Sequence, residues 1–342
     1  MFSAVLGLFS QDLAVDLGTS ATRVHLSGAG VVADEPSVVA VLDDRAGRRR
    51  VIAIGDEALP MLGRTPDDIS AIQPIRAGRI EDFEVAEALL LHLVRRIHNR
   101  NGWMRPRMVV AVPHGASDME LRAVRDSCES AGARAVHLVP RPLAAALGAG
   151  LPVEQPTGHL VVDLGAGATE ISVLSLSGVV ASTAVPGGGD GLDDAIISWC
   201  KKEHALLVGR PSAHRVKIEL GAACHPDHGA STWLKGRCLR RGSPRAEQVT
   251  AGGVCNALQP GIQAIAEGIR TVLHQAPPEL ASDIVETGVV LVGGGAQLPG
   301  IDRALGHLTG LPVVAAENPT RAVVDGAGRV LEELELREKL AS

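Results

Sequence analysis

One hairpin pattern occurs twice in the sequence. Residues 14–24 read AVDLGTSATRV, and residues 161–173 read VVDLGAGATEISV. In each stretch an apolar run ends in Asp-Leu-Gly, small residues follow, and a second run returns. Each stretch therefore predicts a strand, a tight turn and an antiparallel strand. A chain that contains this hairpin twice is predicted to form two related lobes that face each other across a cleft, each offering one hairpin to the same ligand.

The segments after the two hairpins predict an α/β fold. In the first half, strands are predicted over 37–42, 51–55, 107–113 and 135–139, and helices over 81–99 and 117–132, the latter capped by Ser117. In the second half, strands are predicted over 178–185 and 288–292, and helices over 191–207, 254–275, 299–310 and 320–336. Strands that alternate with helices in this way are typical of parallel sheets covered by helices.

Composition limits the classes of function. The chain has 342 residues, of which 46% are apolar, which suits two domains or one large bilobed unit. A net charge of −6 and an aromatic content of 2% argue against nucleic acid as a partner. The five cysteines are widely spaced and include no Cys-x-x-Cys pair, so reduced thiols in a cytosolic protein are expected.

The small-residue turns predict a nucleotide site. Backbone N–H groups can approach an anion closely at Gly18-Thr19-Ser20-Ala21 and at Gly165-Ala166-Gly167-Ala168. The carboxylates of Asp16 and Asp163 are predicted to hold a hydrated divalent cation near the phosphates. A third turn, Gly293-Gly294-Gly295, can pass beneath a base or a ribose. The alternative is three ordinary tight turns, with each Asp capping a neighbouring group.

Longer stretches resemble a known family. The chain resembles the actin, sugar-kinase and heat-shock-chaperone ATPase superfamily, and within it the MreB family of bacterial actins. The resemblance covers nearly the whole length and rests on stretches such as DLAVDLGTSATRV, IQPIRAGRIEDF, LAAALGAGLPVEQPTGHLVVDLGAGATEISV and LVGGGAQL. It implies an actin-like ATPase fold with two lobes, a central cleft for ATP and magnesium, and four subdomains.

The resemblance also implies subdomain boundaries and site residues. Subdomain IA would comprise residues 1–32, 76–145 and 315–342, and IB residues 33–75; IIA would comprise 146–180 and 250–314, and IIB 181–249. The small-residue helices that contain LAAALGAG and VVDGAG match the interdomain hinge, where Ala and Gly permit close helix crossing. The implied nucleotide-binding residues are Asp16, Gly18, Thr19, Ser20, Ala21, Asp163, Gly165, Gly167, Ala168, Thr169, His214, Lys217, Gly293, Gly294, Gly295 and Ala296.

Three departures from the family pattern point to weak hydrolysis. The family usually has a glutamate that positions the attacking water where this chain has Arg141. Ala168 stands where a threonine is usual, and His214 stands where a glutamate is expected to hold the ribose hydroxyls. Arginine has no hydrogen-bond acceptor, so it cannot position the water as a carboxylate does. Arg141 and Ala168 are therefore predicted to be impaired catalytic positions. Neutral drift in an active enzyme is the alternative.

Two segments are candidate membrane contacts. Drawn as a helix, the N-terminal segment places Phe2, Val5, Leu6 and Phe9 on one face, which fits either a locally packed terminus or a short interfacial anchor. Trp103 and Met104 form a second candidate, flanked by Arg100, Arg105 and Arg107. Packing of Trp103 under the following strand is the alternative reading.

The function predicted from the sequence is that of an MreB-like cytoskeletal protein. It would bind ATP and magnesium and assemble with itself into filaments. It would lie in the cytoplasm at the inner face of the membrane and serve cell shape and wall growth, with another MreB and membrane proteins of wall growth as further partners. The alternatives are an active ATPase or phosphotransferase of the same fold, and a non-polymerising paralogue that binds an active MreB.

Overall fold

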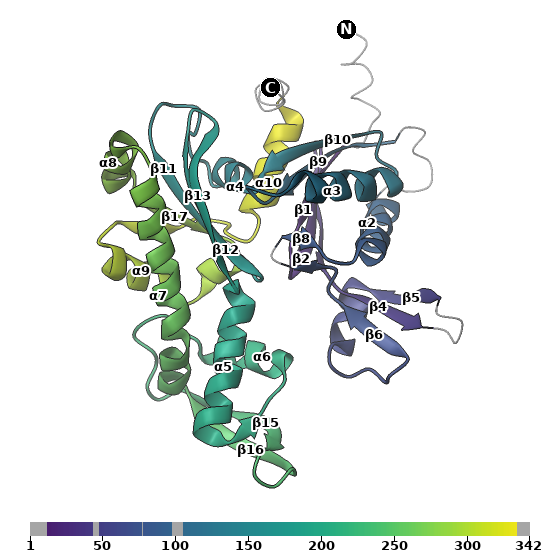
Figure 1. Cartoon of the computed structure of the whole chain (residues 1–342), viewed down its shortest axis with the longest axis vertical. Helices are drawn as coiled ribbons and strands as arrows, with labels where there is room; N and C mark the ends of the chain where they lie inside the picture. Colours follow the sequence, from purple (N-terminus) through teal and green to yellow (C-terminus); the bar gives the residue numbers. More distant parts are fainter. Residues whose placement is uncertain (1–11, 44–47, 77, 98–104, 334–342) are drawn as a thin grey trace. The chain divides into compact units, whose positions relative to one another are not determined.

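The computed structural model describes residues 12–43, 48–76, 78–97 and 105–333, and its contacts divide the chain into two units (Figure 1). Unit 1 comprises Met1–Gln155 and Arg321–Ser342, and unit 2 comprises Pro156–Thr320. Each unit has its own sheet and its own buried cluster of Val, Leu, Ile and Ala. The finer division into four subdomains stays a prediction.

The sheet of unit 1 has the strand order β10-β9-β1-β2-β3. β1 pairs in parallel with β9, and β9 pairs in parallel with β10, while β1, β2 and β3 form an antiparallel meander. Every residue of β1 is buried, as expected for a central strand covered on both faces. The bounds are β1 Leu13–Leu17, β2 Ala21–Leu26, β3 Gly30–Pro36, β9 Arg107–Val112 and β10 Ala135–Pro140.

Among the described residues of unit 1, four helices accompany this sheet: α2 Phe83–Ile97, α3 Asp118–Ser130, α4 Arg141–Gly148 and α10 Ala322–Glu332. The predicted cap of α3 is confirmed: Ser117 and Glu120 form a capping box, in which each side chain accepts a hydrogen bond from the other's backbone N–H. Smaller elements are β4 Val39–Asp43, β5 Arg49–Ile54, β6 Ile69–Ile72, β7 Ile75–Arg76, β8 Arg79–Ile80 and the 3-10 turns η1 Gly55–Glu57 and η2 Leu59–Met61.

The sheet of unit 2 repeats this arrangement, with the strand order β13-β12-β11-β17-β18. β11 pairs in parallel with β17, β17 pairs in parallel with β18, and β11, β12 and β13 form an antiparallel meander. Both meanders carry a register shift between their second and third strands. The bounds are β11 His159–Leu164, β12 Ala168–Ser175, β13 Gly178–Pro186, β17 Val289–Val292 and β18 Val313–Ala315. The prediction that the two hairpins begin two related lobes is confirmed.

The helices of unit 2 include a long one, α7, that packs along β12 and β13 (Figure 1). The bounds are α5 Gly188–His204, α6 Arg210–Leu220, α7 Ala251–Gln275, α8 Pro278–Thr287, the 3-10 turn η3 Gly294–Gln297 and α9 Ile301–Thr309. A second sheet of three strands contains β14 Leu206–Leu207, β15 Ser231–Cys238 and β16 Pro244–Thr250. Among the helices of the described residues, none combines the length and apolar character that crossing a bilayer requires.

The limits predicted for α5 were wrong at both ends. The helix was predicted over 191–207, but it begins at Gly188 and ends at His204. Ala205 adopts a left-handed conformation with φ 49° and caps the helix, and the N–H of Ala205 donates to the carbonyl of Cys200. Leu206 and Leu207 then pair with β15, so their apolar side chains belong to a strand and not to the last turn of the helix.

The predicted close helix crossing is confirmed within unit 1, where α4 packs against α10. A Cβ atom added to Gly326 would lie 1.8 Å from the carbonyl oxygen of Ala144. A Cβ atom added to Gly148 would lie 1.8 Å from the carbonyl oxygen of Ala322. Only glycine permits backbones to approach so closely, because any larger residue would collide with a backbone atom that cannot rotate away.

We expect Gly326→Ala to destabilise the protein by about 3 kcal/mol, because the added methyl group forces α4 and α10 apart. The matched control is Gly191→Ala in α5, where an added Cβ meets nothing within 4 Å. That substitution should be neutral or stabilising by up to about 1 kcal/mol, the difference in helix propensity. Urea unfolding of both variants measures the two effects, and equal stability of the two would contradict the close crossing.

Candidate functional site

The first predicted turn, Gly18-Thr19-Ser20, is fixed from behind by Ser37. The hydroxyl of Ser37 donates to the carbonyl of Gly18 at 2.7 Å, and the N–H of Ser37 donates to the carbonyl of Ser20 at 3.0 Å. Ser37 is fully buried, and its hydroxyl also lies 2.9 Å from that of Thr22. Two carbonyls of the turn are thus engaged by one residue, which fixes the backbone of the turn. No role in the turn was predicted for Ser37 from the sequence.

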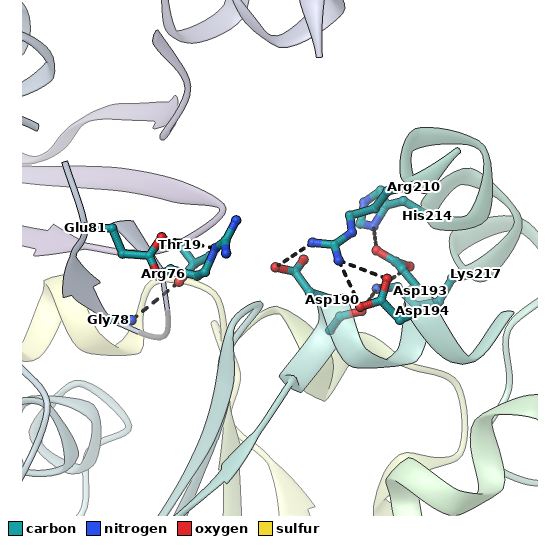
Figure 2. A network of polar contacts seen from close by, with 11 residues as sticks. Thr19, Arg76, Gly78, Glu81, Asp190, Asp193, Asp194, Arg210, His214 and Lys217 are labelled. Carbon is teal, nitrogen blue, oxygen red and sulfur yellow. Dashed lines mark hydrogen bonds and ion pairs between the residues drawn. The ribbon is translucent and has the colours of Figure 1, made fainter. Parts of the chain in front are cut away.

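Glycine is required within this turn. A Cβ atom added to Gly18 would lie 2.5 Å from the carbonyl oxygen of Ala21. The hydroxyl of Thr19 accepts a hydrogen bond at 3.5 Å from the N–H of Gly78, the residue just before β8 (Figure 2). Thr19 is buried and Ser20 is exposed, so the turn has one anchored and one accessible hydroxyl group.

Asp16 lies at the end of β1 in an ion pair with Arg141. One guanidinium nitrogen of Arg141 donates to a carboxylate oxygen of Asp16 at 2.5 Å. The side chain of Asp16 is 2% exposed and that of Arg141 is 15% exposed. Arg141 is the first residue of α4 and directly follows β10. Because β1 and β10 run in the same direction in one sheet, their carboxyl ends bring the two residues to the same edge.

This ion pair bears on the magnesium predicted from the sequence. A carboxylate that holds a hydrated cation must offer its charge and lone pairs to that cation. In the structure, the charge of Asp16 is already compensated by a guanidinium in direct contact. Asp16, paired in this way, therefore does not fit the cation-holding role predicted from the sequence.

The second predicted turn, Gly165-Ala166-Gly167, is fixed by the start of α5. Its three carbonyls accept hydrogen bonds from three N–H groups of residues 187–190: Gly189 to Gly165 at 2.9 Å, Asp190 to Ala166 at 2.8 Å, and Gly187 to Gly167 at 3.0 Å. Gly188 has φ +43°, and a Cβ atom there would lie 2.4 Å from the carbonyl oxygen of Gly165. This support was not predicted, although three consecutive glycines at 187–189 are a signal for it in the sequence.

The third predicted turn lies against the end of β11. β11 and β17 are parallel neighbours, with Asp163 beside Val292, so the residues that follow them meet at one edge of the sheet. Gly293 has φ +82°, and a Cβ atom there would lie 2.4 Å from a carboxylate oxygen of Asp163. A Cβ atom added to Gly294 meets nothing within 4 Å. The turn is thus tightly packed at Gly293 and open at Gly294.

Lys217 and His214 meet at a buried carboxylate (Figure 2). The ammonium group of Lys217 lies 2.9 Å from Asp193, and Nδ1 of His214 lies 3.2 Å from the same carboxylate. Lys217 also donates to the carbonyl of Gly189 at 2.6 Å, which connects α6 to the glycines that hold the second turn. Side-chain exposure is 2% for Asp193, 10% for Lys217 and 56% for His214. Asp193 was not predicted, because nothing in the sequence shows its partners.

A second ion-pair group follows on α5 and α6. Arg210 lies 3.7 Å from Asp190 and 2.9 Å from Asp194 (Figure 2). Burial raises the pKa of the Asp190 carboxyl, and the positive charge of Arg210 opposes this rise. The backbone of Asp190 holds the second turn while its side chain contacts Arg210, so the ion pair adds to the rigidity of this edge.

The remaining predicted residues lie in or beside the three turns. Ala168 begins β12, and the next residue, Thr169, is buried; Ala21 begins β2; and Ala296 is buried in η3. The predicted membrane residues Phe2, Val5, Leu6, Phe9, Trp103 and Met104 lie outside the described residues. Arg107, which follows Trp103 and Met104 in the sequence, binds the buried carboxylate of Asp12 at 2.5 Å.

Comparison with known proteins identifies the family. The family model described as MreB/Mbl protein matches residues 10–339. The chain belongs to the MreB/Mbl family. Cell shape-determining protein MreB of Escherichia coli (strain K12) is 46% identical over 339 residues, which cover 98% of this chain and 97% of that protein. Cell shape-determining protein Mbl of Bacillus subtilis (strain 168) is 38% identical over 328 residues, which cover 96% of this chain and 98% of that protein.

A solved structure supports the same assignment. The crystal structure of MreB 5 of Spiroplasma citri bound to AMPPNP matches with a TM-score of 0.90 and 30% identity, covering 96% of this chain and 98% of that one. The actin-like fold predicted from the sequence is therefore confirmed. In this MreB/Mbl family member, the predicted site residues form two groups: those around Asp16 and the first turn in unit 1, and those around the second and third turns in unit 2.

Lys217→Met tests the buried cluster of this MreB/Mbl family member. We expect a loss of about 3–5 kcal/mol of stability, because the charge of Asp193 loses its main partner in a buried site. Adding Asp193→Asn should recover part of this loss by removing that charge. The matched control is Lys202→Met, which changes a lysine on α5 that is 84% exposed and should change stability by less than about 0.5 kcal/mol. Urea unfolding measures the stability of the unmodified chain and of the three variants. If Asp193→Asn lowers the stability of Lys217→Met further, the two side chains do not form the proposed pair.

Proposed function

We propose that this chain is an ATP-binding cytoskeletal protein that assembles into filaments on the cytoplasmic face of the cell membrane and acts in cell shape and wall growth. The observation that carries the proposal is the MreB/Mbl family membership over residues 10–339. The names of the E. coli and B. subtilis relatives describe them as cell shape-determining proteins. The S. citri structure, with the same fold, holds the ATP analogue AMPPNP.

The geometry of the turns supports ATP as the ligand. In the first and second turns the carbonyls are engaged by Ser37 and by residues 187–190. The N–H groups of these turns would then face the anion. Gly294 is open where an adenosine would pass, while Gly293 is packed against the strand end. Lys217 and His214 at the edge of α6 would contact the nucleoside. The proposed binding residues are those that the sequence predicts.

Weak hydrolysis is the second part of the proposal. A group that positions and deprotonates the attacking water contributes about 10²–10⁴-fold to the rate of such a reaction. Arg141 is always protonated and has no acceptor, and Ala168 lacks a hydroxyl group. In addition, the Arg141 guanidinium is bound to Asp16. ATP would therefore be retained longer than in an enzyme with a carboxylate at position 141.

Attachment to the membrane is the third part. Phe2, Val5, Leu6 and Phe9 would form an interfacial anchor, and Trp103 with Met104 a second contact. Each contact is weak alone, but a filament presents many copies, and multivalent binding raises the overall affinity.

ATP is expected to raise the midpoint of thermal unfolding, because a ligand of the native state adds RT ln(1 + [L]/Kd) to its stability. Gly294→Val should abolish the shift, since a side chain there meets open space in the protein and would fill the adenosine side of the site. Gly252→Val is the matched control, because an added Cβ there meets only His228 at 3.7 Å. Absence of any shift with the unmodified protein at millimolar ATP would remove nucleotide binding from the proposal.

Deletion of residues 2–9 is expected to reduce binding to liposomes of bacterial phospholipids, because it removes the apolar face of the anchor. Co-sedimentation measures the bound fraction, and electron microscopy of the same samples with ATP shows whether filaments lie on the vesicles. Phe2→Ser with Phe9→Ser is the milder variant and should lower binding in the same direction. If both variants bind as the unmodified chain does, the N-terminal anchor is wrong, and Trp103→Ser then tests the second contact.

A further inference from the structure

The Asp16–Arg141 ion pair has a consequence for the ligand chemistry of unit 1. Asp16 is the last residue but one of the central strand β1, close to the first turn, and its side chain is 2% exposed. The guanidinium lies 2.5 Å from its carboxylate. A buried carboxylate at the edge of an anion-binding turn repels the anion unless a cation compensates its charge. In this chain the compensating cation is covalently part of the protein.

Arg141 lies where a positive charge is unfavourable, so its ion pair with Asp16 has to offset that free-energy cost. Arg141 is the first residue of α4, where the positive end of the helix dipole disfavours a cation. Its side chain is only 15% exposed, so it also gives up most of its hydration. The attraction of Asp16 offsets both costs. The other arginine beside Asp16 in the sheet, Arg23, pairs with Asp34 at 3.1 Å.

A guanidinium and a hydrated divalent cation compete for the same carboxylate. Both are attracted by Asp16, and they repel each other at the few ångströms that separate groups around one carboxylate. A guanidinium is also a good partner for phosphate oxygens, because its N–H groups form charge-assisted hydrogen bonds. It can therefore balance the charge of Asp16 and of a nearby phosphate group without a metal ion.

We propose that Arg141 replaces a divalent cation as the counter-charge at Asp16, so that this chain binds ATP almost independently of magnesium. The inference rests on the proposed nucleotide binding and specifies how that site balances its charge. It assigns Arg141 a positioning role toward the ligand, separate from its inability to act as a base. A variant of this chain with a neutral residue at position 141 would need a divalent cation to bind ATP.

The test is the dissociation constant of the full-length protein for ATP, measured by equilibrium dialysis with magnesium and again with EDTA. For the unmodified chain we expect the two constants to agree within about threefold. For Arg141→Gln, binding in EDTA should be at least about tenfold weaker than in magnesium, the change that one hydrogen bond between charged groups typically gives. Arg141→Lys keeps the positive charge and should retain most of the independence from magnesium.

The control is Arg49→Gln, which breaks a different Arg–Asp pair of unit 1. In that pair, Arg49 lies 2.7 Å from Asp82, and neither residue is a predicted site residue. This variant should behave as the unmodified chain does. Circular dichroism and thermal unfolding show whether each variant is folded. The comparison of ATP binding in magnesium and in EDTA can also be made with the unmodified chain alone, which does not depend on the folding of any variant.

The outcomes separate the two proposals. If the unmodified chain binds ATP in magnesium and loses it in EDTA, the replacement is wrong while nucleotide binding stands. If Arg141→Gln binds equally well under both conditions, Arg141 is not the counter-charge, and the inference also fails. If ATP does not bind under either condition, the proposed nucleotide site is wrong and the inference falls with it.

Discussion

Parallel pairing at the centre of each sheet is the constraint on which the candidate site depends. Parallel neighbours end at the same edge, so whatever follows β1 and β10 in unit 1, or β11 and β17 in unit 2, is brought together there. This is how Asp16 meets Arg141, and how Asp163 meets Gly293. Ligand sites in open α/β sheets generally lie outside the carboxyl ends of such strands.

The two units reach the same geometry by different local means. In unit 1 the carbonyls of the first turn are held by the hydroxyl and the N–H of Ser37. In unit 2 three N–H groups of residues 187–190 hold the second turn, and the glycines there are necessary because Gly188 has a positive φ and touches the turn. The hairpins are therefore repeated in sequence and strand order, whereas the residues that support them are not.

Much of the fold could be predicted because its signals are local. The two Asp-Leu-Gly hairpins, the capping box at Ser117 and the small residues of α4 and α10 each need only a short window of sequence. The end of α5 was missed because Ala205 takes a left-handed conformation that alanine rarely adopts. Here the pairing of Leu206 and Leu207 with β15 outweighs the local preference for helix.

Single site residues could be predicted from local motifs in the sequence. The residues that contact them in the folded protein could not. Asp16 and Arg141 are far apart in the chain, and a sequence does not show that a carboxylate and a guanidinium will share one strand edge. The same holds for Asp193, whose contacts with Lys217 and His214 come from the packing of α5 against α6. Such pairs depend on tertiary structure alone.

The Asp16–Arg141 pair of unit 1 and the Asp193–Lys217 pair of unit 2 each contain a buried aspartate, and the two pairs differ in what they do for the protein. In unit 2, Lys217 also donates to the carbonyl of Gly189, so its charge serves to hold the second turn in place. In unit 1, the first turn is held by Ser37, which is neutral, and does not depend on Arg141. The Arg141 charge is therefore placed beside a turn that is already fixed. This contrast is why we assign a ligand-directed role to the arginine of unit 1 and a structural role to the lysine of unit 2.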